Sequence, residues 1–172
     1  PHIWLDPERA ARMVENLADG LAELDPGHAE AYLQNGRHTA QSYRDAALAF
    51  RQRLEDLSCR ELVTFHDGFA YFAEAFDLTI LKAIEEEAGS EASARDISEV
   101  VVLIRQYRLP AIFTELNGSS ATADAIAREF DPPLQVAVLT TIMSYDELAR
   151  GADDIYLAMM EYNVNQVLEA LS

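Results

Sequence analysis

The stretch Glu61-Leu-Val-Thr-Phe-His66, continued by Asp67-Gly-Phe-Ala-Tyr-Phe72, decides the fold class of this chain. Its first half is a short apolar and β-branched run, which is typical of a strand buried on both faces of a parallel sheet. Its second half leads through a glycine into a helical pattern. The stretch therefore predicts a strand that turns directly into a helix, with the polar ring of His66 at the turn.

Three further runs of this kind follow, and helical patterns alternate with them. The predicted strands are residues 61–66, 78–84, 111–115 and 134–140, and the predicted helices are residues 68–76, 93–107, 119–130 and 153–171. This alternation predicts an α/β fold in which helices cover both faces of a four-stranded parallel sheet through right-handed crossovers. Ligands of such sheets gather at the carboxyl ends of the strands, where His66, Glu115 and Thr141 stand.

Two long helices are predicted ahead of the sheet. Asp6-Pro7-Glu8 has the ingredients of a helix start, and apolar residues recur at three- and four-residue steps as far as Leu24. A second helical pattern runs from about residue 27 to residue 57, long enough for a rod of roughly 45 Å. Its small residues, among them Gly36 and Ala40, would permit close packing against a neighbour.

Composition limits the possible functions. The chain has 172 residues, of which 49% are hydrophobic and 25% charged, as expected for one folded domain with a sizeable core. Thirteen Lys and Arg against thirty Asp and Glu give a net charge of −17, which repels nucleic acid and favours a divalent cation as partner. Cys59 is the single cysteine, so no disulfide forms within the chain, and no run of about 18 apolar residues suggests a membrane span.

His2 and His66 are the candidate metal ligands, because neutral imidazole is a good donor for zinc. Each also has an ordinary interpretation, since a histidine next to a chain start is often disordered and a strand-end histidine is often simply hydrogen-bonded. Glu115 is expected first to hydrogen-bond the far nitrogen of a ligating histidine, next to cap the turn at residues 117–120, and last to bind metal directly. Asp67 is expected to be a helix cap before a ligand. His28 and His38 are placed in the two long helices without a role.

Pro1-His-Ile-Trp-Leu-Asp-Pro7 resembles the signature that opens the second half of the metal-binding substrate-binding proteins of zinc and manganese ABC importers. Residues 63–72 are similar to the strand-to-helix turn of that family, and residues 87–94, 111–115 and 119–120 look like later segments of the same lobe. The resemblance covers nearly the whole chain. It implies that residues 1–57 are the end of an inter-lobe segment with a long connecting helix, and that residues 58–172 are the C-terminal α/β lobe.

The resemblance implies that His2 and His66 hold a captured zinc ion, with manganese as the alternative, and that the ion is delivered to an ABC transporter permease. A further ligand would come from an N-terminal lobe that is missing here. The fourth ligand of the family is usually an aspartate, but the neutral Thr141 stands near its place, and Asp146 and Glu147 are substitute candidates. The location implied is periplasmic or otherwise extracytoplasmic, with any signal peptide or lipid anchor lying upstream.

Two other functions stay open. The chain could be an interaction module that keeps the lobe fold without metal transport and forms a homodimer through its long helix. A metallohydrolase would need an open metal site and a general base. No His-Glu-x-x-His, nucleophile-elbow or glycine-rich phosphate motif appears, so we expect a protein that is not an enzyme.

Overall fold

The predicted alternation of strands and helices is present in the computed structural model, which describes residues 2–85, 93–116, 118, 120–143 and 149–172. The elements are η1 (Ile3–Leu5), α1 (Pro7–Leu24), η2 (Pro26–His28), α2 (Ala29–Arg53), β1 (Glu61–His66), α3 (Ala70–Ala75), β2 (Thr79–Glu85), α4 (Ala94–Tyr107), β3 (Ala111–Glu115), α5 (Ala121–Arg128), β4 (Gln135–Leu139) and α6 (Ile155–Leu171). The α/β prediction is confirmed. The second long helix is shorter than predicted, because the 3₁₀ turn that holds His28 precedes it and because it ends at Arg53 and not near residue 57.

The four strands form one parallel sheet in the order β2-β1-β3-β4. In the pair of β3 and β4, Ala111 lies opposite Gln135 and Glu115 lies opposite Leu139. Because the strands are parallel, their carboxyl ends share one edge of the sheet. The last residues of β1 and β3, His66 and Glu115, therefore lie at the edge where β4 also ends.

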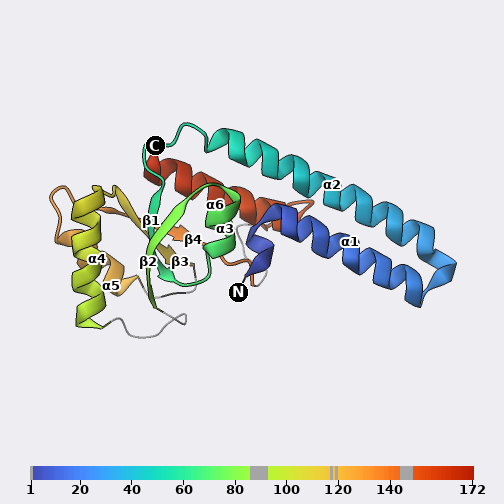
Figure 1. Ribbon diagram of the computed structural model, residues 1–172, viewed down its shortest axis with the longest axis horizontal. Helices are drawn as coiled ribbons and strands as arrows, with labels where there is room; N and C mark the ends of the chain where they lie inside the picture. Colours follow the sequence, from blue (N-terminus) through green and yellow to red (C-terminus); the bar gives the residue numbers. More distant parts are fainter. Residues whose placement is uncertain (1, 86–92, 117, 119, 144–148) are drawn as a thin grey trace.

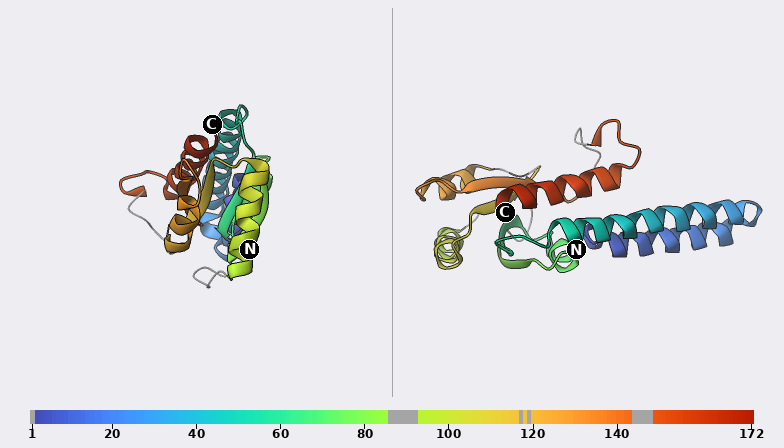
Figure 2. Two further views of the ribbon diagram at one scale, coloured as in Figure 1. Left: turned by 90° about the vertical axis from the view of Figure 1, so that its left-hand side faces the viewer. Right: turned by 90° about the horizontal axis from the view of Figure 1, so that it is seen from above.

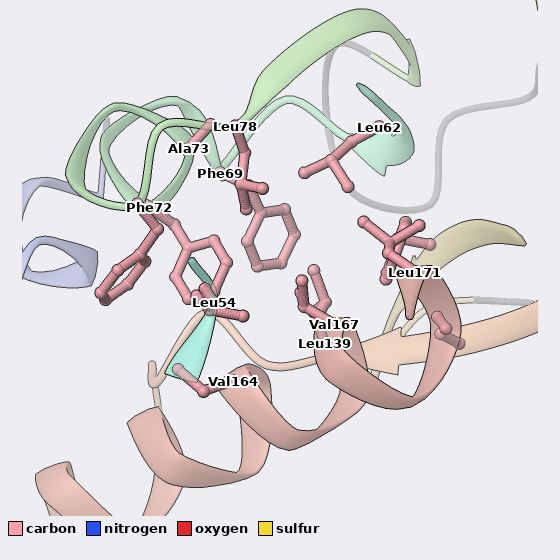
Figure 3. Close-up of a cluster of buried hydrophobic side chains, with 14 of the residues drawn as sticks. Leu54, Leu62, Phe69, Phe72, Ala73, Leu78, Leu139, Val164, Val167 and Leu171 are labelled. Carbon is pink, nitrogen blue, oxygen red and sulfur yellow. The ribbon is translucent and has the colours of Figure 1, made fainter. Parts of the chain in front are cut away.

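Alternate side chains of the strands enter two separate cores. On one face, Leu62 of β1 packs with residues of α2, α3 and α6, while on the other Val63 packs with residues of α4 and α5. Figure 3 shows the first core, in which Phe69, Phe72 and Val164 meet between α3 and α6. Full burial of one such side chain contributes about 1.5–3 kcal/mol. This core fixes the turn after β1 against the sheet.

α1 and α2 form a hairpin that projects from the α/β body (Figures 1 and 2). The two helices meet through small residues: a Cβ atom added at Gly36 would lie 2.4 Å from the Cβ of Ala18. The large apolar residues of α1 are instead exposed, with Leu17 at 64% and Leu24 at 85% relative exposure. Within the described residues, no helix is both long enough and apolar enough to cross a bilayer.

The predicted start of α1 is present in detail. Asp6 is the N-cap, its side chain accepts a hydrogen bond from the backbone N–H of Glu8 at 2.9 Å, and Pro7 is the first helical residue. Such a cap contributes about 1 kcal/mol. The cap also ends the short 3₁₀ turn η1, so the chain segment that carries His2 leads directly into a fixed helix start.

Candidate metal centre

The rings of His2 and His66 lie together at the carboxyl edge of the sheet, although 64 residues separate them in the sequence. His66 ends β1 and His2 immediately precedes η1. Their Nε2 atoms are 3.0 Å apart and their ring centroids 5.3 Å apart. Two nitrogen ligands of one tetrahedral zinc are separated by roughly 3.3 Å, given Zn–N bonds near 2.05 Å. In the structure the two rings are hydrogen-bonded to each other through these nitrogens, and their spacing is also close to that of two nitrogen donors to a single ion.

Gly68 leaves the space in which these rings meet. A Cβ atom at this position would lie 2.5 Å from Cδ2 of His66 and 2.7 Å from Cδ2 of His2. Any side chain at residue 68 would therefore push against both imidazoles. This role could not be predicted from the local sequence, because the contact with His2 depends on tertiary structure.

The environment of His2 favours its neutral form. Burial first, and then the positive charge of the neighbouring His66, lower the pKa of His2 below its usual 6.5, while the negative charge of Glu115 acts in the opposite sense. A neutral imidazole offers the lone pair that a metal requires. Near neutral pH, the geometry and the charge state of His2 both suit metal binding.

Glu115 and Thr141 are brought together beside the histidines. The buried hydroxyl of Thr141 donates a short hydrogen bond to the carboxylate of Glu115, and the backbone carbonyl of Thr141 accepts the indole N–H of Trp4 at 2.8 Å. We first expected Glu115 to hydrogen-bond the far nitrogen of a ligating histidine. No such hydrogen bond is present among the described atoms. Nδ1 of His66 is buried without a hydrogen-bond partner among the described residues.

Asp67 does not cap a helix, so that prediction was wrong. The helix α3 begins at Ala70, its N-cap is Phe69, and no side-chain hydrogen bond caps it. Two residues separate Asp67 from the helix start, and its exposed side chain borders a groove along β2 and α3. Neither His2 nor His66 lines that groove.

The described part of the chain offers half of a metal site. No group of three or more His, Cys, Asp or Glu within it is arranged to hold an ion. The substitute carboxylates considered above, Asp146 and Glu147, lie outside the described residues, as do residues 87–92 and 119 of the segments that resembled the family. Two imidazole donors that converge need further donors to complete a tetrahedral zinc shell.

The remaining titratable candidates lie elsewhere. His28 bonds Asp25 at the tip of the helical hairpin, with 2.8 Å between Nδ1 and Oδ2, and His38 is exposed on α2. Burial raises the pKa of the Cys59 thiol, which is the opposite of what an activated nucleophile needs. These positions give no support to a catalytic role.

Comparison with known proteins shows which family the chain resembles as a whole. The model of a family described as the periplasmic zinc-uptake complex component A, ZnuA, matches residues 1–170. The zinc-binding protein AdcA of Streptococcus pyogenes is 27% identical over 164 residues, which cover 95% of this chain and 32% of AdcA. The zinc-binding protein TroA of Treponema pallidum is 27% identical over 176 residues, covering 100% of this chain and 57% of TroA.

Among solved structures, a Zn(II)-bound variant of AdcAII from Streptococcus pneumoniae superimposes with a TM-score of 0.85 at 28% identity. The match covers 100% of this chain and 60% of AdcAII. The chain thus spans between about a third and three-fifths of the length of these relatives. Their names describe binding proteins, in agreement with the expectation that this chain is not an enzyme.

Proposed function

Because this chain belongs to the family of zinc-uptake complex component A, we propose that it contributes His2 and His66 to the capture of a zinc ion. The main observation that supports this proposal is the distance of 3.0 Å between their Nε2 atoms at the carboxyl edge of the sheet. The lowered pKa of His2 supports the proposal, because a ligating imidazole must be neutral. Capture of this kind needs no bond-making beyond coordination.

Zinc is favoured over manganese by the type of donor. Imidazole nitrogen suits zinc, whereas manganese prefers oxygen donors. The carboxylate of Glu115 lies at the same edge of the sheet, and Thr141 already hydrogen-bonds it. The site thus has more nitrogen than oxygen character, and zinc is the cargo we propose.

A second lobe would supply the remaining donors and cover the exposed face of α1. The relatives are longer than this chain, and the exposed side chains of α1 form an apolar stripe at helical spacing. The stripe consists of Met13, Leu17, Leu21 and Leu24. An apolar surface of this kind marks a contact with another protein surface. Delivery of the ion to an ABC transporter permease outside the cytoplasm is the role that follows for the complete protein.

Isothermal titration with Zn²⁺ tests the proposal. We expect the chain by itself to bind zinc weakly or only through a second copy, because it holds two of about four donors. His66→Ala should abolish this binding, while His38→Ala, which removes an exposed imidazole from α2, should leave it unchanged. Equal heats for the parent chain and His66→Ala would remove His66 from the site.

Size-exclusion chromatography distinguishes the interaction-module alternative. A dimer that forms only with zinc would indicate that two half-sites share one ion. A dimer that persists in the presence of a chelator would instead favour the interaction module, which associates through its long helix without a role for metal.

A further inference from the structure

Two hydrogen bonds from distant parts of the chain hold the short segment that carries His2. The hydroxyl of Tyr156, in α6, donates to the backbone carbonyl of Trp4 at 2.8 Å. The indole N–H of Trp4 donates in turn to the backbone carbonyl of Thr141, just beyond β4, also at 2.8 Å. The partners of Trp4 thus lie 137 and 152 residues away along the chain.

We propose that Trp4 and Tyr156 are positioning residues, which set the zinc affinity by holding the ring of His2 against His66 without touching the ion. The inference rests on the proposed zinc-binding function and adds to it the residues that orient one ligand. The hydroxyl of Tyr156 and the indole N–H of Trp4 both donate to backbone carbonyls, so neither group is directed at the ion itself.

The local structure gives His2 little stability of its own. It precedes a 3₁₀ turn of three residues, and the internal bond on its carbonyl comes from the backbone N–H of Leu5 at 3.1 Å. A turn this short does not persist unaided, because helical nuclei cost more conformational entropy than their few hydrogen bonds recover. The orientation of His2 therefore depends on contacts between this turn and the rest of the molecule.

Trp4 connects the turn that carries His2 to the rest of the molecule. Its ring lies 5.2 Å from the ring of His2, and its carbonyl and indole N–H are both engaged. Since Thr141 also donates to Glu115, the same bonds connect His2 with the ends of β3 and β4. Both imidazoles are therefore held in position relative to the same edge of the sheet.

Tyr156 is itself rigidly placed. Its ring packs on the ring of Tyr43 in α2, with centroids 4.5 Å apart. Burial, first among several causes, raises the pKa of Tyr156 well above its usual range, so the hydroxyl stays protonated and remains a donor. The bond to Trp4 therefore joins the His2 turn to two helices at once.

Groups that orient a metal ligand typically change metal affinity by 10–100-fold when they are removed. We expect Tyr156→Phe, which deletes one hydroxyl and keeps the ring, to raise the zinc dissociation constant of the full-length protein about ten-fold. Trp4→Phe, which loses the indole N–H, should have an effect of at least the same size. Tyr107→Phe, at the exposed end of α4, is the matched control and should have no effect.

A double-mutant cycle with His2→Ala separates positioning from general damage. If the hydroxyl acts through His2, Tyr156→Phe should weaken zinc binding in the parent and change nothing further in the His2→Ala background. An equal loss in both backgrounds would overturn the proposal, as would unchanged zinc binding by Tyr156→Phe. Failure of the parent protein to bind zinc, or binding unaffected by His66→Ala, would instead contradict the proposed function itself.

Discussion

At the scale of single residues, Thr141 decides how much negative charge the candidate site carries. Its hydroxyl binds Glu115, and it is a neutral side chain at the edge where the imidazoles meet. Thr141→Asp would add a carboxylate donor, so we expect zinc affinity to rise about ten-fold or more. Without metal, the new carboxylate should reduce stability, because two like charges would stand together.

Calorimetry and thermal unfolding, each with and without zinc, check this expectation. Thr79→Asp is the control, because it adds the same charge at an exposed position at the opposite end of the sheet. Equal zinc affinities for Thr141→Asp and the parent chain would show that position 141 does not face the ion.

Gly68 is a second residue at which a small substitution should change the zinc affinity. Its missing Cβ leaves room for the rings of His2 and His66, which a new Cβ would approach to 2.7 and 2.5 Å. Gly68→Ala requires a small displacement of the rings, whereas Gly68→Val adds two methyl groups in the same space. We therefore expect graded losses of zinc affinity, with the valine variant the weaker binder. Identical affinities in a titration series would contradict this packing argument.

At the scale of elements, the contact between α1 and α2 is close because its residues are small. Gly36 has Ala18 as its neighbour at 2.4 Å from a hypothetical Cβ, while Gly20, also helical, has nothing within 4 Å. Gly36→Ala should therefore destabilise the hairpin by about 1–3 kcal/mol through overpacking. Gly20→Ala should stabilise the chain by up to about 1 kcal/mol, because alanine is the better helix former.

Urea unfolding of the two variants measures both signs in one experiment. The chemical change is the same, so the comparison isolates the effect of the neighbouring helix. A stabilising Gly36→Ala would mean that α1 and α2 are further apart in solution than in the structure.

The junction of β2 and α4 should be sensitive to acid. Nζ of Lys82 lies 2.9 Å from Asp96 and 2.8 Å from Glu99. The hydrogen bond with Ser93 first, and then Lys82, lower the pKa of Asp96 from 3.8 to about 2. A carboxylate whose pKa is lowered on folding stabilises the folded state at pH values above its unfolded pKa. For Asp96 this contribution is lost as the pH falls from 3.8 through about 2.

Lys82→Met tests the linkage. The variant should be less stable than the parent at neutral pH, and the difference should shrink as the pH falls through this window, because the partners of Lys82 become protonated. Unfolding followed by circular dichroism across the acid range measures it. A difference that is independent of pH would assign the effect to packing of the lysine stem.

At the scale of the whole molecule, the sequence predicted what depends on local periodicity and on the parallel sheet. It predicted strands at 61–66 and 111–115, and from their shared direction the meeting of His66 with Glu115 and Thr141 at one edge. It did not predict the space left by Gly68, since that depends on a residue 66 positions away. Asp67 was misassigned because the start of α3 was placed two residues too early.

The exposed apolar stripe of α1 shows that hydrophobic periodicity alone does not tell whether an apolar face is buried within the chain or against a partner. Apolar residues at helical spacing normally indicate a buried face. Here the alanines of α1 pack on α2, while Leu17 and Leu24 remain exposed. Periodicity identifies the surface that is to be covered, but the covering partner decides whether that surface is the core of this chain or an interface.

The last prediction concerns this stripe. In the chain by itself, Leu17→Gln with Leu24→Gln should change the free energy of unfolding by no more than about 0.5 kcal/mol per site, because both side chains are exposed. Self-association measured by sedimentation should fall. In the full-length protein the same pair should lower the unfolding temperature and weaken zinc binding, because a second lobe would lose its apolar contact. Leu48→Gln, at an exposed position of α2, is the control; if it reproduces both effects, the stripe is not the surface on which the second lobe packs.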